Sequence, residues 1–162
     1  VHLGGRTPTL ADLAKLPYAM MVFKESMRLY PPAYVVARRA LRDVEVAGRH
    51  IPKGHLVVIN IIGMHHDPAL FRDPERFDPE RFTPEAEKAL PKNAFLPFGA
   101  GPRVCIGNHF ALMEGHLALA TLAQRVRFER SPSAPPAEME PLVTLRPKGG
   151  MPMTVHRRAI EA

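Results

Sequence analysis

The residues best suited to chemistry surround the only cysteine of the chain, Cys105, in the glycine-rich run 98–107 (FGAGPRVCIG). Glycines let backbone N–H groups approach a sulfur closely, and the helix-compatible sequence that follows adds the partial positive charge of a helix N-terminus. Arg103, two residues before the cysteine, favours the thiolate further. The spacing therefore predicts a stabilised thiolate that serves either as a nucleophile or as a metal ligand.

A second polar pattern lies far upstream, where Glu25 and Arg28 stand three residues apart in a mostly apolar stretch. On an exposed helix such a pair contributes only ~0.2–0.5 kcal/mol. On a mostly buried helix both charges must be hydrogen-bonded, and a further guanidinium could satisfy the carboxylate. Arg81, in Pro-Glu-Arg-Phe at 79–82, is a candidate.

The histidines give a weaker metal signal. His65, His66 and Asp67 are consecutive, but adjacent residues of one element point in different directions and rarely chelate together. We interpret His66 as a surface residue. His109 and His116 lie seven residues apart and no His-Glu-x-x-His pattern occurs, so a zinc site is not expected.

The elements that must hold these groups can be read from apolar spacing and from proline. The patterns predict a short helix at 9–13, a helix that follows Pro17 and ends at Pro31-Pro32, strands at 44–46 and 56–59, a short helix at 62–66, and a helix capped by Asn108 that runs to about Arg125. Residues 67–97 are rich in proline and charge, and we expect a coil pinned to the surface by phenylalanines. In the tail, the strands 142–145 and 153–155 are expected to pair across Gly149-Gly150.

Composition narrows the class of protein. The chain has 162 residues, of which 46% are apolar, as in a globular domain, and its single cysteine excludes an internal disulfide. We therefore expect a reducing, cytoplasmic location. The net charge of +6 is scattered along the chain, which favours docking of an acidic protein over nucleic-acid binding. The chain has no signal peptide and no membrane span, but it opens without methionine, so we expect a missing N-terminal part. A membrane anchor in that part stays open.

Taken in order, the motifs resemble those of the cytochrome P-450 superfamily, the haem-thiolate monooxygenases. They are Glu-x-x-Arg at 25–28, Leu-Tyr-Pro-Pro at 29–32, Phe-Asp-Pro-Glu-Arg-Phe at 77–82 and Phe-x-x-Gly-x-Arg-x-Cys-x-Gly at 98–107. The resemblance covers essentially the whole chain but only the C-terminal part of that fold. It implies a mainly α protein with small β-sheets, with residues 1–162 forming a single partial domain. The N-terminal helices and the central oxygen-activating helix, with its acid–alcohol pair, would be absent.

The resemblance also implies roles for individual residues. Cys105 would be the axial thiolate of haem b, and glycines would let the loop pass close to the porphyrin. The cofactor-binding set would be Arg38, Phe98, Gly101, Arg103, Cys105 and Gly107, with Arg39 as the alternative to Arg38. Glu25, Arg28 and Arg81 would form a buried structural triad. Arg76, in the first copy of the same short sequence, is the competing partner, and Arg81 is preferred because Phe77 precedes its Pro-Glu-Arg-Phe as the family pattern expects. The possible substrate-facing residues are Ala33, Val35, Val36, Leu142 and Val143, for which plain core packing is the alternative.

The implied reaction is insertion of one oxygen atom of O₂ into a small hydrophobic organic substrate. Electrons would come from a separate protein, such as a ferredoxin, a flavodoxin or a reductase. Because the distal acid–alcohol pair has no match in this chain, we expect the chain alone to be inactive. The alternative from another class is a haem-binding module without catalysis.

Overall fold

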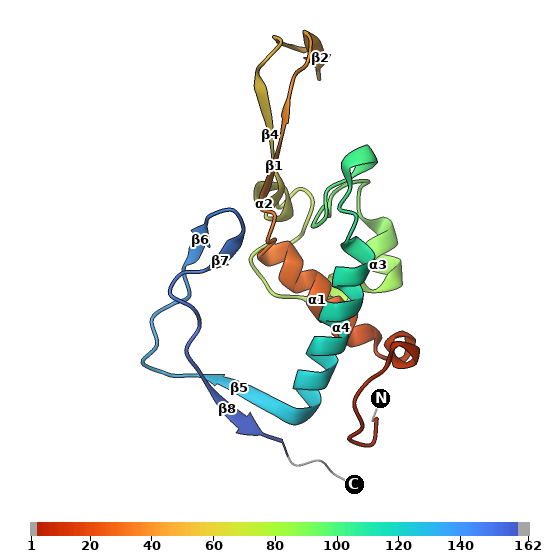
Figure 1. The fold of residues 1–162 in the computed structure, drawn as a ribbon, viewed down its shortest axis with the longest axis vertical. Helices are drawn as coiled ribbons and strands as arrows, with labels where there is room; N and C mark the ends of the chain where they lie inside the picture. The colour runs from red at the N-terminus through yellow and green to blue at the C-terminus, as the bar shows by residue number, and fades with distance from the viewer. Residues whose placement is uncertain (1–2, 159–162) are drawn as a thin grey trace.

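Two helices that pack side by side form the centre of the structure, a computed structural model that describes residues 3–158. These are α1 (Pro17–Leu29) and α4 (Asn108–Arg125) (Figure 1). Their close approach depends on Gly115 of α4, because a Cβ at this position would overlap the ring of Phe23 on α1. This packing fixes α4, and with it the cysteine loop that directly precedes α4, relative to α1.

The remaining elements surround this pair. The other helices are η1 (Leu10–Lys15), α2 (Ile61–His65), η2 (Pro79–Phe82), α3 (Pro84–Ala89) and η3 (Gly101–Arg103), where η marks a 3₁₀ helix. The strands, each followed by its antiparallel partner, are β1 (Val35–Arg39) with β4 (Leu56–Asn60), β2 (Val44–Val46) with β3 (Arg49–Ile51), β5 (Val126–Arg130) with β8 (Met153–Arg157), and β6 (Met139–Pro141) with β7 (Leu145–Pro147). The mainly helical fold with small sheets is therefore as the sequence predicts.

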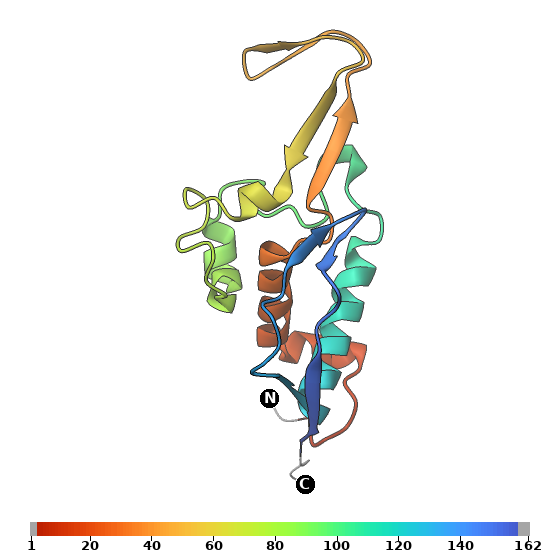
Figure 2. The same cartoon turned by 90° about the vertical axis from the view of Figure 1, so that its left-hand side faces the viewer.

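A long hairpin projects away from the helices. Its base is the β1–β4 pair, in which Val35 lies opposite Asn60, and its tip is the β2–β3 pair (Figures 1 and 2). At the tip, Ala47 and Gly48 both have positive φ, the backbone that a tight antiparallel turn requires. Strand β1 follows α1 closely, so the hairpin is attached to the C-terminal end of that helix.

Proline sets the helix boundaries that the sequence predicts for α1. Pro17 occupies the first turn, where its missing N–H is not needed, and Pro31-Pro32 prevents the helix from continuing. The helix predicted at 62–66 is present as α2, and Asn60 caps it by accepting a hydrogen bond from the Gly63 amide (3.1 Å). The cap predicted for α4 is wrong by one position. Gly107 is the N-cap, since its carbonyl accepts the first helical bond from Ala111.

The predicted pairing of the tail is wrong. Strand β8 pairs with β5, which continues directly from α4, and residues 142–144 form the turn between β6 and β7. This turn is tied to the segment after α1, because the Leu145 amide donates to the Pro32 carbonyl (2.9 Å). The strand β1 was not predicted either. Both features depend on partners that are distant in sequence.

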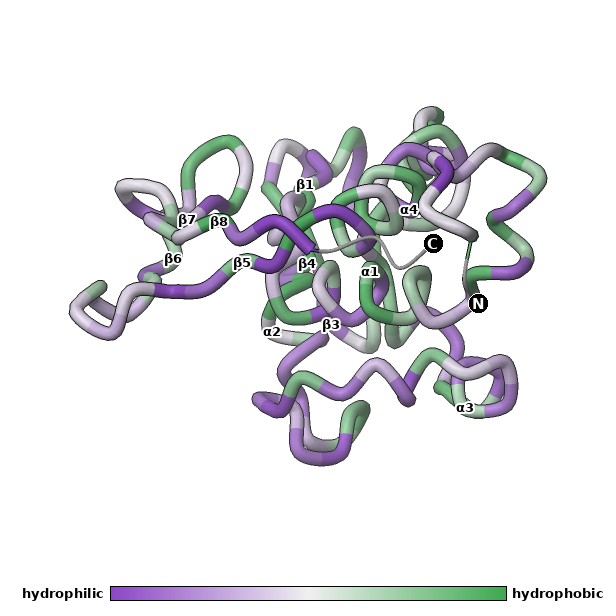
Figure 3. The backbone as a smooth tube through the Cα atoms, turned by 90° about the horizontal axis from the view of Figure 1, so that it is seen from below, coloured by the Kyte–Doolittle hydropathy of each residue, from purple (hydrophilic) through white to green (hydrophobic). Residues whose placement is uncertain are grey.

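The buried apolar core is small. The apolar residues that are buried are Met21, Met27, Leu29, Ile61, Phe71, Phe82, Ala94 and Ala120. The accessible surface is 11660 Å², whereas a compact monomer of 18.0 kDa exposes about 8,000 Å². In Figure 3 the paired strands β5 and β8 are mainly hydrophilic. Much of the order of this chain must therefore come from polar contacts as well as from apolar packing.

The coil at 67–97 is partly pinned as expected. Phe71 and Phe82 are buried, while Phe77 is exposed. The coil also contains η2 and α3, which were not predicted, and Lys24 of α1 binds Glu87 of α3 (2.6 Å). The coil thus runs beside α1 and leads towards the cysteine loop.

Candidate functional site

The cysteine loop folds back on itself just before α4. The Cys105 amide donates to the Phe98 carbonyl (3.0 Å), and the Gly99 amide donates to the Leu96 carbonyl (3.1 Å). On the other side, the Cys105 carbonyl accepts from the Asn108 amide (3.3 Å) at the start of α4. The cysteine is therefore fixed by backbone bonds on both sides, beside a helix N-terminus whose partial charge favours an anion.

Two glycines are required by the backbone of this loop. Gly99 and Gly101 both have φ of +71°, a conformation that side-chain-bearing residues rarely adopt. Gly107 is different: its φ is −89°, and a Cβ there would lie 3.9 Å from the Cys105 sulfur. That distance is an ordinary van der Waals contact, so neither the backbone nor the sulfur requires glycine at this position in the described chain.

The surface around the sulfur is open and apolar. Cys105 is a free, exposed thiol, and Val104, Ile106 and Phe110 beside it in sequence are also exposed, with Ile106 completely so. The guanidinium of Arg103 is exposed and has no ion-pair partner within residues 3–158. This combination suits a flat apolar group that carries anionic substituents and binds a soft sulfur ligand.

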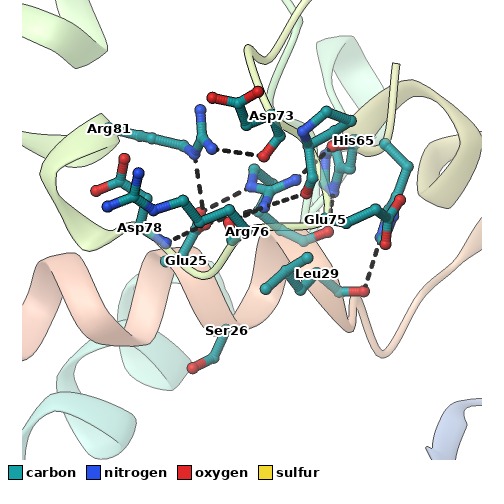
Figure 4. A network of polar contacts seen from close by, with 12 residues as sticks. Glu25, Ser26, Leu29, His65, Asp73, Glu75, Arg76, Asp78 and Arg81 are labelled. Carbon is teal, nitrogen blue, oxygen red and sulfur yellow. Dashed lines mark hydrogen bonds and ion pairs between the residues drawn. The ribbon is translucent and has the colours of Figure 1, made fainter. Parts of the chain in front are cut away.

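A buried network of polar contacts joins α1 to residues 65–81 (Figure 4). Glu25 and Arg28 are completely buried, and Arg28 Nε donates to Glu25 Oε2 at 2.7 Å, while a terminal nitrogen donates to Oε1 at 2.9 Å. The other guanidinium donors reach backbone carbonyls of His65 (2.7 Å) and Pro74 (2.7 Å). The Asp78 amide donates a further bond to Glu25 (2.9 Å). The pair is therefore hydrogen-bonded on every side, as a buried ion pair requires.

Arg81 is the guanidinium that the structure brings to this pair. Its Nε lies 3.5 Å from Glu25 Oε1, and one of its terminal nitrogens donates to the Asp73 carbonyl (2.8 Å). Arg76 contributes only its backbone carbonyl, which accepts from Arg28 (3.3 Å), while its side chain is exposed. The structure thus brings together the three predicted residues of the triad, with Arg76 as a backbone partner.

His66, which the sequence predicts to be a surface residue, is partly covered, whereas its neighbour His65 lies in the core. His65 is completely buried, with its ring 5.3 Å from that of Phe95, and burial lowers its pKa from about 6.5 to about 4. His66 is half-buried, and its ring binds Glu75 (2.8 Å) and the Leu29 carbonyl (3.0 Å). The apolar residues of 61–64 were the signal that the end of this short helix is covered. No cluster of three metal-binding side chains occurs within the described residues.

A family model described as "Cytochrome P450" matches residues 1–153. The chain belongs to the cytochrome P450 family. It is 43% identical over 130 residues to a cyclooctat-9-en-7-ol 5-monooxygenase of Streptomyces melanosporofaciens, covering 80% of this chain and 28% of that protein. It is 42% identical over 156 residues to the putative cytochrome P450 132 of Mycobacterium tuberculosis, covering 96% of this chain and 33% of the relative.

The fold agrees with that of a solved P450. The crystal structure of the cytochrome P450DA heme domain superposes with a TM-score of 0.87 at 29% identity, covering 96% of this chain and 34% of that one. The chain therefore spans about a third of the length of the relatives that it matches. None of the helices in the part of the chain described has the length and apolarity to span a membrane.

The residues present fit the haem that this P450 family binds. The Cys105 thiol is open, its neighbours are apolar, and a Cβ is missing beside the sulfur. Arg38 is exposed on β1, and within residues 3–158 its guanidinium donates only to the adjacent Ala37 carbonyl (2.8 Å). Its charge, like that of Arg103, is therefore available to an anionic group.

The predicted substrate-facing stretches of this P450 lie together. The Tyr34 hydroxyl donates to the Leu142 carbonyl (2.9 Å), which joins the start of β1 to the β6–β7 turn. Ala33, Val35, Leu142 and Val143 are exposed, and Val36 is half-buried. Four of the five residues are therefore exposed in the described chain, and their contact with substrate stays a prediction.

Proposed function

We propose that this chain supplies the iron-binding thiolate and the surrounding haem contacts of a P450 monooxygenase. The observation that carries the proposal is Cys105, an exposed thiol held by the Phe98 carbonyl and by the start of α4 in an open apolar surface. Family membership supports it, because the relatives include a monooxygenase. Bound haem b supplies the activation of O₂, with one oxygen atom passing into a substrate.

The residues of this chain orient that group. Cys105 binds the iron as the thiolate, and the helix N-terminus beside it offsets the negative charge of the sulfur. Phe98, whose carbonyl binds the Cys105 amide, would pack beside the sulfur and limit its contact with water once haem is bound. Gly101 and Gly107 keep the loop close to the porphyrin. Arg103 and Arg38 pair with the two propionates, since both guanidiniums are exposed and free of acidic partners among residues 3–158.

The substrate class follows from the two joined stretches. Ala33, Val35 and Val36 of one, with Leu142 and Val143 of the other, present apolar surface from adjacent segments. Apolar surface of this kind binds a small hydrophobic organic molecule by desolvation. We propose a separate redox protein, a ferredoxin, a flavodoxin or a reductase, as the source of the electrons, and the net charge of +6 favours docking of an acidic partner.

The test is the absorption spectrum of the chain mixed with haem, reduced and exposed to carbon monoxide. A strongly red-shifted Soret band that disappears in Cys105→Ala is the expected result. His109→Ala is the matched control, since His109 is the exposed imidazole nearest to the cysteine on α4 and must not affect the band. A band that survives in Cys105→Ala and disappears in His109→Ala contradicts thiolate ligation. A thiolate-type band is expected of both the monooxygenase and the non-catalytic haem-binding module, and an upstream reading frame that encodes the acid–alcohol helix favours the monooxygenase.

A further inference from the structure

One buried imidazole joins the end of α1 to the segment that leads into the cysteine loop. His65 is the last residue of α2, and its side chain is completely buried. Its Nδ1 lies 3.2 Å from the Arg28 carbonyl, and its Nε2 lies 2.9 Å from the Leu96 amide. These two partners belong to segments more than thirty residues away on either side.

The two partners fix the protonation state of the ring. The Leu96 amide is only a donor, so Nε2 must carry a lone pair. The Arg28 carbonyl is only an acceptor, so Nδ1 must carry the proton. The neutral Nδ1–H tautomer is therefore the one form that satisfies both contacts. A doubly protonated ring would turn an N–H towards the N–H of Leu96.

The surroundings of the ring oppose a positive charge. The guanidinium of Arg28 donates to the His65 carbonyl (2.7 Å), so the two residues bind each other through side chain and backbone in both directions. Phe71 and Phe95 enclose the ring, with centroids at 6.3 and 5.3 Å. Burial is the main cause that lowers the pKa of His65, and the charges of Arg28 and His66 lower it further. The backbone of Arg28 and Met27 raises it through hydrogen bonds, but by less. The nearest carboxylate on α1, Glu25, is already bound by Arg28.

The connection continues from Leu96 to the sulfur-bearing residue. The Leu96 carbonyl accepts from Gly99, whose positive φ begins the turn of the loop, and Phe98 then accepts from the Cys105 amide. The Leu96 peptide is thus bound on one side to the imidazole and on the other to the loop. Releasing its amide would free the start of that turn.

The geometry points to His65 as a positioning residue for the cysteine loop. The neutral imidazole holds the Leu96 peptide, and protonation of the imidazole releases that peptide. The consequence for the haem site rests on the function proposed above. The link itself concerns only contacts within this chain, and it can be measured without haem.

The first test is amide hydrogen exchange of Leu96 in the full chain at pH 7, compared with that of Tyr30, whose amide bonds to the α1 backbone. His65→Phe keeps the aromatic packing and removes both contacts, and it should lower the protection of Leu96 about tenfold relative to Tyr30. His65→Gln returns an acceptor near the position of Nε2 and should restore most of this protection. The control is His116→Phe, since His116 is also buried but binds the Leu16 carbonyl at the opposite end of α1 (2.8 Å).

The second arm uses the wild-type chain, so it does not depend on how well a variant folds. As the pH falls below about 4, Leu96 should lose protection before Tyr30 does. If Leu96 and Tyr30 lose their protection from exchange at the same pH, the inference that protonated His65 releases the Leu96 peptide alone is contradicted. Equal Leu96 protection in His65→Phe and His116→Phe overturns the inference as well.

The haem readout separates this inference from the proposed function. In the reduced carbon monoxide complex, His65→Phe should lower the red-shifted fraction of the Soret band about tenfold, while His116→Phe should leave it unchanged. A normal band in His65→Phe refutes the positioning role and leaves thiolate ligation intact. If no variant or wild-type chain binds haem, the proposed function fails for this chain, and the exchange of Leu96 still decides the inference.

Discussion

Replacing Glu25 by glutamine should remove a large part of the stability of this chain. The carboxylate accepts two hydrogen bonds from Arg28 and one from the Asp78 amide in a completely buried site. Glutamine keeps the size of the side chain but removes its charge and turns an N–H towards these donors. Arg28 becomes an uncompensated buried cation, which costs about 3–5 kcal/mol. A domain is commonly stable by only about 5–15 kcal/mol.

A double-mutant cycle measures the coupling directly. Arg28→Met leaves Glu25 buried without its main partner, and the double variant relieves both stranded charges. The double variant should therefore be more stable than the sum of the single losses predicts, by about 1.5 kcal/mol or more. The assay is urea unfolding followed by far-ultraviolet circular dichroism at pH 7.

The control cycle lies on the same helix. Lys24 binds Glu87 at 2.6 Å, but their side chains are 21% and 37% exposed. Lys24→Met with Glu87→Gln should give a coupling of only ~0.2–1 kcal/mol, because water and salt screen this pair. A coupling energy between Glu25 and Arg28 that does not exceed this control value would refute the reasoning that burial makes this pair contribute more to stability than a partly exposed pair.

Two further variants test the packing and the acid sensitivity of the fold. Gly115→Ala should destabilise the chain by about 0–2 kcal/mol, because a gain in helix propensity is outweighed by overlap with Phe23, and the sign should reverse in a Phe23→Leu background. Thermal unfolding checks this, and an effect independent of Phe23 contradicts it. Between pH 6.5 and about 4 the unfolded chain protonates His65 and the folded chain does not, so wild-type stability should fall by ~3 kcal/mol. His65→Phe lacks this loss. The difference in free energy of unfolding between wild type and His65→Phe, measured from urea-unfolding curves, should therefore be smaller at pH 5 than at pH 7. An equal difference at both pH values argues against a buried neutral His65.

The parts of the fold that the sequence predicts are those with local signals. Pro17 and Pro31-Pro32 mark the two ends of α1, and the apolar pattern after Gly107 marks α4. The cysteine loop is equally local, since its glycines, arginine and cysteine lie within ten residues. Glu25 and Arg28 are three residues apart on one helix, so their pairing also follows from helical geometry.

The features that the sequence does not predict depend on distant partners. The pairing of β5 with β8 joins Val126 to Arg157, and neither strand has an alternation strong enough to choose a partner. The role of His65 is set by contacts 37 and 31 residues away, to Arg28 and Leu96. A histidine at the end of a short helix carries no sign of these contacts in its own surroundings.

The buried polar side chains of this chain hydrogen-bond the backbone of a coil, as neighbouring strands do for each other in a sheet. The coil at 67–97 has few strands or helices of its own to fix its backbone, yet its Pro74 and Arg76 carbonyls are held by a single guanidinium. That guanidinium also binds the His65 carbonyl, and the His65 ring binds the Leu96 amide. Because the Arg28 and His65 side chains are buried and hydrogen-bonded to backbone, moving either one displaces a defined peptide rather than a side chain alone. The backbone of the coil is therefore held by α1 through Arg28 and His65, and this support extends to the loop that carries Cys105.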